Sequence, residues 1–389
     1  MAVITGVSQN IDILILHDAP LDEWKGTQRS LLEYGNYLRD KGYTVLYLSP
    51  AQFKRPLGED KIILKTEIKF KLLTYKLRHL GVYFIPNKIL KQLRPRLVYV
   101  STFNAFPYIS IRQAKIIFGS FVYGPEHEVV DSVVRKVSIY FKKKLFLVLL
   151  KFYAKDSVCF HVLNETQGNW LNNLIGDNFK IHVIPPPLDC NKYFLDYSQS
   201  KYDPVFSVLY HGPLTVDKGF AYFSRIIEKI NSLKSYDFIK FNIVSHGGPL
   251  FEMAVKLQKN WSNVFLFSSV SEEEKIQFYR TNHLLITPSK VENFHFVTAE
   301  AQLCGMPVIS SDISGPRGII INGITGDLVP IGDIEGFVDK IEKYWKMWKS
   351  DKDQYWKMRA VIAISAKRFC STNTLPEFYS VVKSLIISP

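Results

Sequence analysis

Short apolar runs alternate with amphipathic stretches along most of the chain. Residues 27–40 have the spacing of a helix, which Gly42 is placed to end. The first half contains six apolar runs rich in β-branched and aromatic residues, at residues 11–17, 44–49, 97–102, 115–122, 158–163 and 181–184. Apolar strands that alternate with helices predict a parallel sheet covered on both faces.

Three consecutive prolines, at residues 185–187, interrupt this pattern, because proline neither continues a helix nor donates to a sheet. A polar stretch at residues 196–203 follows, and we place a hinge at about 185–203. The pattern then restarts with five apolar runs, at residues 206–211, 238–245, 264–267, 283–287 and 308–311. We therefore predict an α/β protein of two doubly wound, Rossmann-like domains. Ligands of such domains bind outside the carboxyl ends of the strands, here in a cleft between the two.

The composition is that of a globular protein, since 47% of the 389 residues are hydrophobic and 22% are charged. The longest strongly apolar run, residues 145–150, is far shorter than the roughly 20 residues of a membrane-spanning helix. No secretory signal is recognisable at residues 1–10. The four cysteines are scattered without a CxxC pair, which predicts no metal site, makes a disulfide framework unexpected and favours a reducing cytoplasm.

The net charge of +13 is concentrated in one block. Residues 51–150 hold 19 Lys and Arg against 6 Asp and Glu, so this block accounts for the whole excess. Within residues 135–155, seven cations flank or interrupt aliphatic and aromatic side chains. Such a pattern favours docking of residues 51–155 on an anionic membrane surface. No recognisable nucleic-acid-binding module accompanies it, and we expect no nucleic acid as partner.

The strongest chemical signal is PSKVENFHFVTAEA at residues 288–301, followed by GMPVI at 305–309. A strand precedes this segment, Glu292 lies in a loop, and a helix begins near His295 and ends at Gly305. Two carboxylates, Glu292 and Glu300, are then placed to bind sugar hydroxyls. The free N–H groups at the helix start suit a diphosphate.

This segment resembles the donor-site signature of retaining GT-B glycosyltransferases, the glycosyl transferases of group 1, which reads P-S-x-x-E-G-F-G, four residues, E-A and G-x-P-V-I. The resemblance implies that Glu292 meets the transferred sugar and Glu300 the ribose. Asn293, Phe294 and His295 would line the donor, although Asn293 and His295 stand where the family has glycines.

A second segment, HGPLTVDKG at residues 211–219, resembles the family's G-R-L-x-x-x-K-G loop. Gly212 and Lys218 are in register, and the resemblance implies that Lys218 neutralises the departing diphosphate. Pro213 occupies the place of the arginine, so we take Arg317 as a candidate for the missing charge.

Three further residues have roles implied by the resemblance. Gly26 lies where the family has a glycine-rich loop facing the diphosphate. Tyr123 stands where the family has a histidine that reaches sugar and acceptor, and His127 lies four residues later.

The family assignment implies an acceptor-binding domain at 1–190 and a donor-binding domain at 191–364, with a C-terminal helix of about 365–389 packing back on the first. It implies metal-independent, retaining transfer from a nucleotide sugar, UDP- or GDP-linked, to a glycan or lipid-linked acceptor, without a cofactor. The expected location is the cytoplasmic face of a membrane. Alternatives are a catalytically weak or inactive protein that binds nucleotide sugar, and a sugar phosphorylase or epimerase on the same scaffold.

Overall fold

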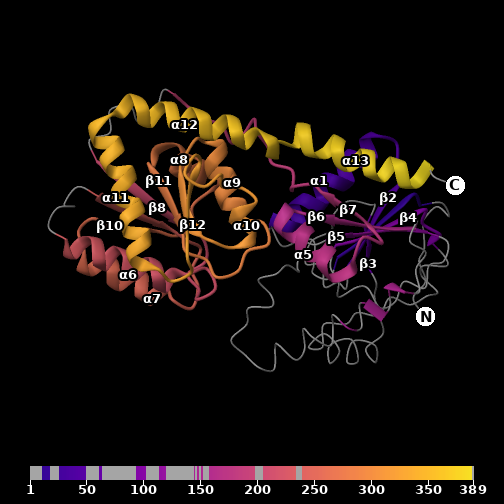
Figure 1. Cartoon of the computed structure of the whole chain (residues 1–389), viewed down its shortest axis with the longest axis horizontal. Helices are drawn as coiled ribbons and strands as arrows, with labels where there is room; N and C mark the ends of the chain where they lie inside the picture. Colours follow the sequence, from indigo (N-terminus) through magenta and orange to yellow (C-terminus); the bar gives the residue numbers. More distant parts are fainter. Residues whose placement is uncertain are drawn as a thin grey trace. The chain divides into compact units, whose positions relative to one another are not determined.

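The structure is a computed structural model. It describes residues 11–17, 26–49, 61–63, 93–101, 114–119, 144, 147–148, 150–151, 157–197, 205–233 and 239–387. The chain forms two compact units (Figure 1). Unit 1 comprises Met1–Pro187 and Thr372–Pro389, and unit 2 comprises Leu188–Ser371. The polypeptide thus leaves unit 1 once and returns to it for its last helix.

Unit 1 contains a parallel sheet of seven strands in the order β3-β2-β1-β4-β5-β6-β7. Its strands are β1 (Ile13–Leu16), β2 (Val45–Ser49), β3 (Lys61–Ile63), β4 (Leu97–Val100), β5 (Lys115–Gly119), β6 (Val158–Val162) and β7 (Lys180–Val183). The described helices of this unit are α1 (Gly26–Asp40), α5 (Glu165–Ile175) and, except for its first residue, α13 (Ser371–Ile387).

Unit 2 contains a parallel sheet of six strands in the order β10-β9-β8-β11-β12-β13. Its strands are β8 (Phe206–His211), β9 (Ile239–Val244), β10 (Val264–Phe267), β11 (Leu284–Thr287), β12 (Val308–Ser311) and β13 (Gly326–Val329). Its helices are α6 (Phe220–Ser232), α7 (Phe251–Asn260), α8 (Glu272–Thr281), α9 (Phe296–Leu303), α10 (Ser314–Arg317), α11 (Ile334–Ser350) and α12 (Lys352–Ala366), followed by the 3-10 turn η5 (Lys367–Phe369).

Both sheets reverse their strand order once, which is the mark of doubly wound folds. The reversal lies between β1 and β4 in unit 1 and between β8 and β11 in unit 2. The prediction of two doubly wound parallel sheets is therefore confirmed. The reversal in unit 2 positions a ligand site outside the carboxyl ends of β8 and β11.

Aromatic side chains pack the C-terminal helix α13 against the rest of unit 1, where it runs alongside α1 (Figure 1). Phe378 of α13 stacks on Tyr34 of α1, with ring centroids 4.1 Å apart. It also contacts Tyr99 and His161 from the sheet. Nε2 of His161 lies 2.7 Å from the carbonyl of Ile184, and burial lowers the pKa of this histidine to about 4. The ring is therefore neutral at pH 7 and serves as part of the core.

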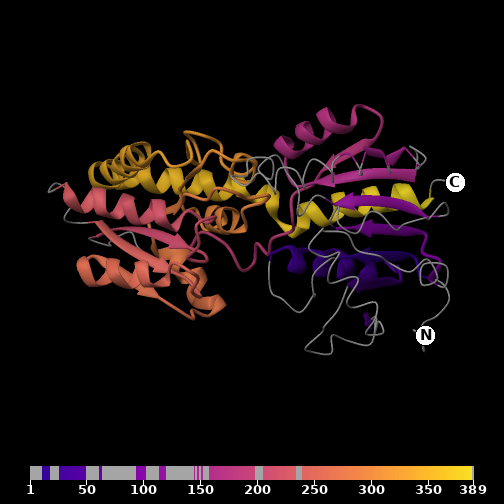
Figure 2. The ribbon, with the colours of Figure 1, turned by 90° about the horizontal axis from the view of Figure 1, so that it is seen from below.

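The core of unit 2 continues from the sheet into its long C-terminal helices. Helix α11 packs against α6, and α12, which can be followed in Figure 2 by its golden colour, packs against α9. The buried Arg359 of α12 donates to the carbonyls of Cys304 and Gly305 at the end of α9. Gly305 has a left-handed φ of +73°, as expected for the residue that ends this helix.

Two short strands differ from the sequence prediction. Residues 326–329 are not among the predicted strands and form β13, which pairs in parallel with β12. Residues 61–63 were not assigned and form the edge strand β3. Residues 61–63 are too few to show a pattern, and residues 326–329 (GDLV) include only two large apolar side chains, so neither segment stands out as an apolar run.

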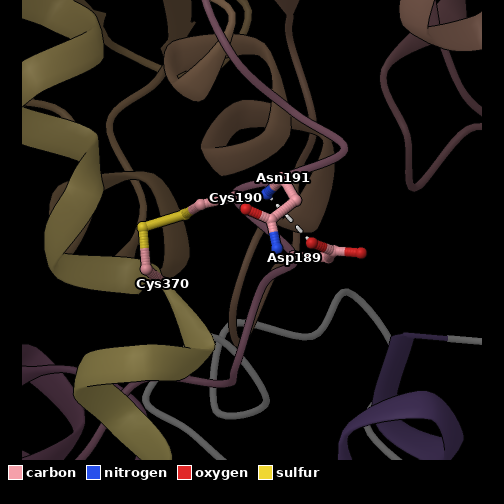
Figure 3. Close-up of a disulfide and its surroundings, with 4 residues drawn as sticks. All are labelled: Asp189, Cys190, Asn191 and Cys370. Atoms are coloured by element: carbon pink, nitrogen blue, oxygen red, sulfur yellow. Dashed lines mark hydrogen bonds between the residues drawn. A yellow bond between two sulfur atoms is a disulfide. The ribbon is translucent and has the colours of Figure 1, made fainter.

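A disulfide between Cys190 and Cys370 contradicts the expectation that the cysteines stay unpaired (Figure 3). The backbones around the two sulfurs are also joined, because Leu188 N–H donates to Phe369 and Ser371 N–H donates to Leu188. The cysteines are 180 residues apart in sequence, so no short sequence motif predicts their pairing.

Within the described part of the chain, none of the helices is long and apolar enough to cross a membrane.

Candidate active site

The loop after β8 brings Lys218 toward the loop after β11. Gly219 has a left-handed φ of +69°, and a Cβ at this position would overlap the carbonyl of Pro288. Lys290 N–H donates to the carbonyl of Asp217 at 2.8 Å and holds the two loops in register. Only glycine permits this close approach, which explains the Lys-Gly pair at 218–219.

Lys218 and Glu292 meet directly where these loops touch. Lys218 Nζ lies 2.7 Å from Glu292 Oε1, and the carboxylate is buried whereas the lysine side chain is 34% exposed. His295 Nε2 lies 3.2 Å from the same oxygen. Burial by itself raises the pKa of Glu292, but His295 and Lys218 outweigh it and lower the pKa to about 2. Glu292 is therefore an anion at neutral pH.

Glu300 lies in the second turn of α9 and is buried within a separate polar network. Its Oε2 lies 3.3 Å from Lys275 Nζ and 3.2 Å from the hydroxyl of Tyr279, both from α8. The Tyr279 hydroxyl is also 2.7 Å from His211 Nδ1 at the end of β8. Tyrosine has one hydroxyl proton, so when Tyr279 donates it to Glu300, His211 donates to the tyrosine oxygen. Burial lowers the pKa of His211 to about 4, which leaves the ring neutral.

The other predicted donor residues of unit 2 lie after β8 and immediately before α9. Gly212 follows β8 with a φ of +151°. The side chain of Phe294 is buried and contacts the rings of Phe296 and Phe369. His295 directly precedes α9, and Asn293 lies two residues before His295.

The remaining predicted residues lie on other segments of the chain. Arg317 forms a two-pronged ion pair with Asp312, with one contact of 3.0 Å. The carbonyl of Pro213 accepts from the hydroxyl of Tyr210 at 3.0 Å. Gly26 is the first residue of α1 in unit 1. Tyr123 and His127 lie outside the described residues, as does most of the basic block at 51–155.

Sequence reasoning missed Lys275, Tyr279 and Thr298. Lys275 and Tyr279 are four residues apart on α8 and therefore lie on one face of that helix. This spacing was the available signal, but only the fold shows that this face meets Glu300.

Comparisons with known proteins agree with this architecture. Residues 198–360 match the family described as "Glycosyl transferases group 1", which confirms the resemblance over this part of the chain. The chain is similar to an uncharacterized 41.2 kDa protein in the cps region of Klebsiella pneumoniae, with 26% identity over 46% of each chain. It is also similar to the capsular polysaccharide biosynthesis glycosyltransferase CapM of Staphylococcus aureus, with 37% identity over 21% of each. The chain thus spans less than half the length of these curated relatives.

Solved structures match over nearly the whole chain. Sucrose-phosphate synthase from Thermosynechococcus elongatus has a TM-score of 0.76 at 15% identity, covering 97% of this chain and 99% of that one. Anabaena HepE in complex with UDP-glucose has a TM-score of 0.68 at 15% identity, covering 96% and 100%. At this identity the likeness establishes the GT-B fold.

Proposed function

We propose, on the premise that residues 198–360 carry a domain of the glycosyl transferases group 1 family, that this chain is a retaining glycosyltransferase. It would move a sugar from a nucleotide-sugar donor to a hydroxyl of a glycan or lipid-linked acceptor. The observation that carries the proposal is the 2.7 Å contact of Lys218 with Glu292 outside the carboxyl ends of β8 and β11. A cation for a diphosphate and a carboxylate for a sugar are thereby adjacent.

Lys218 supports the departure of the nucleoside diphosphate. An ammonium group has three N–H donors, and Glu292 takes one of them, so two remain for phosphate oxygens. The negative charge on those oxygens grows as the bond to the sugar breaks. A cation fixed at that place stabilises the transition state more than the bound donor.

Front-face attack suits the side chains present. The acceptor oxygen forms a bond to the anomeric carbon on the face from which the nucleoside diphosphate leaves with the bonding electron pair. The acceptor proton passes to the departing phosphate, so no enzyme base and no metal is required. Glu292 orients the sugar and Glu300 the ribose. Tyr123 and His127 remain our candidates at the acceptor end.

A UDP- or GDP-linked sugar is the proposed donor class. Glu300, in the second turn of α9, is buried beside Lys275 and Tyr279 of α8, in keeping with a role in holding a ribose. The structurally similar HepE was solved with UDP-glucose, which makes UDP-glucose the first donor to test.

The test combines binding and transfer. Thermal unfolding is measured with UDP, GDP, UDP-glucose and GDP-mannose, because a ligand that binds only the folded state raises the unfolding temperature, and a tighter ligand raises it more at equal concentration. Transfer of labelled sugar to lipid-linked and glycan acceptors follows, and the anomeric configuration of the product is determined by NMR. Transfer with inversion would contradict the retaining mechanism. Absence of binding to any of these nucleotides would contradict the function as a whole.

A nucleotide-sugar-binding protein with little turnover is the second candidate. The place of the family's arginine is occupied by Pro213, and Arg317 is engaged with Asp312. Tight binding of nucleotide sugar without transfer would favour this candidate. In that event Pro213→Arg should raise turnover if the missing cation is the cause.

We also propose that residues 51–155 dock on an anionic membrane, on the strength of their charge alone. Because Cys190 and Cys370 form a disulfide, the cysteines no longer support the expected cytoplasmic location. Co-sedimentation with anionic and neutral vesicles at low and high salt tests the docking. Binding that ignores lipid charge and salt would contradict it.

A further inference from the structure

His295 is an imidazole at a position where the resembled family has glycine. It lies directly before α9, and its side chain is only 7% exposed. Burial of a polar ring requires partners for both of its nitrogens. Both partners belong to the candidate active site.

The two ring nitrogens join α9 to the carboxylate of Glu292. Nδ1 lies 2.6 Å from the hydroxyl of the fully buried Thr298, and Nε2 lies 3.2 Å from Glu292 Oε1. A neutral ring that donates from Nε2 to the carboxylate accepts the Thr298 proton at Nδ1, and a charged ring donates from both nitrogens. In either state the imidazole gives Glu292 a hydrogen bond, and Thr298 fixes the plane of the ring.

The two carboxylate oxygens of Glu292 differ in their hydrogen-bond partners. Lys218 and His295 both contact Oε1. No residue that the structure describes forms a hydrogen bond to Oε2. An ionised carboxylate accepts hydrogen bonds at both oxygens. The protein thus secures one oxygen and leaves the other for a ligand.

We propose that His295 is a positioning residue for the donor sugar. Together with Lys218 it fixes Oε1, so that Oε2 is presented to a sugar hydroxyl in a single orientation. The inference rests on the proposed function, because it assigns the sugar of a nucleotide sugar to this oxygen. It adds a residue that the family signature lacks. With glycine at this place, Glu292 would lose one of its two supports.

The test separates sugar recognition from nucleotide recognition. Dissociation constants are measured for the matched pairs UDP and UDP-glucose, and GDP and GDP-mannose, by calorimetry. The ratio within a pair is the gain in affinity due to the sugar. For His295→Ala we expect this gain to fall about 10- to 100-fold, as for lost supports of other ligating groups, while affinity for the nucleoside diphosphate changes less than about twofold.

Matched variants distinguish loss of the contact with Glu292 from general damage to the fold. His295→Gln retains an N–H near Glu292 and should restore most of the sugar-dependent gain. Thr298→Ser keeps the hydroxyl and should retain more of the sugar-dependent gain than Thr298→Val, which removes the hydroxyl. Each variant is first checked for a cooperative unfolding transition.

The outcomes are distinguishable. If wild type binds a nucleotide sugar more tightly than its nucleoside diphosphate, and His295→Ala does the same, the positioning role is wrong and the proposed function stands. Equal loss of affinity for both ligands in His295→Ala would also overturn the role, because it indicates a damaged helix start. If wild type binds neither ligand, the proposed function fails, and the inference fails with it.

Discussion

Two buried carboxylates in unit 2 have similar surroundings but differ in one respect. Asp327 of β13 receives Lys340 at Oδ1 and both Lys343 and Tyr344 at Oδ2, at 2.8 to 2.9 Å. Glu292 receives its two partners at Oε1 alone. A carboxylate with both oxygens occupied ties elements together. Glu292 keeps Oε2 without a hydrogen bond from the described residues, and this is the oxygen that we propose meets the sugar.

The pKa values of the two groups do not reveal this difference. Burial alone raises the pKa of each, and neighbouring donors lower it below its ordinary value in both. A depressed pKa therefore identifies a paired carboxylate without saying what the pair is for. The occupancy of the individual oxygens distinguishes the two.

The largest effect should follow Glu292→Gln. The amide cannot pair with Lys218 or accept at both oxygens, so we expect transfer to fall on the order of 100- to 1000-fold with little change in affinity for the nucleoside diphosphate. Initial rates and calorimetric dissociation constants check this. Glu335→Gln, at an exposed carboxylate paired with Lys229, is the control and should leave the rate unchanged. A full rate in Glu292→Gln would mean that Glu292, like Asp327, has only a structural role.

Asp327→Asn should show the opposite pattern. The substitution leaves two cations without their charge partner, so we expect the free energy of unfolding to fall by about 1–3 kcal/mol. The transfer rate per folded molecule should stay unchanged. Urea denaturation followed by tryptophan fluorescence measures the first, and assays well below the transition measure the second. A rate loss like that of Glu292→Gln would contradict a structural role.

Lowering the pH should destabilise unit 2, because Glu292 and Asp327 become protonated. The folded pKa of Glu292 is about 2 against an ordinary 4.5, so its stabilisation is present above about pH 4.5 and is lost as pH falls toward 2. Asp327, whose pKa is also lowered, contributes with the same sign. Urea denaturation at pH 5, 4 and 3 should show a falling free energy of unfolding. The fall should be shallower in Glu292→Gln and in Asp327→Asn. Identical slopes in all three proteins would refute the linkage.

The smallest effect should come from Lys343→Met. The lysine side chain is 39% exposed, and Lys340 and Tyr344 remain beside Asp327. We expect a loss of at most about 1 kcal/mol in the free energy of unfolding, as for other solvent-exposed ion pairs, and no change in transfer. A larger loss would mean that the cations around Asp327 act as one unit.

Much of the fold could be predicted because each buried strand is an apolar run between turn residues. The two donor-site loops could be recognised because Glu292, Glu300 and Lys218 stand at fixed distances from strand ends. What failed depends on contacts between distant segments. Neither the meeting of Lys275 with Glu300 nor the pairing of Cys190 with Cys370 leaves a local trace in the sequence. The half-occupied carboxylate of Glu292 is likewise a property of the packed loops.

The disulfide also determines how the polypeptide would carry a mechanical load. Residues 190 and 370 are joined through sulfur, and nearly all of unit 2 lies in the covalent ring between them. Tension applied at the two ends of the chain would pass from Cys190 to Cys370 through the S–S bond. The donor-site loops would stay outside the path of the force, and only reduction would place unit 2 in series with it. The part of the chain that carries Lys218 and Glu292 is thereby shielded from stretching.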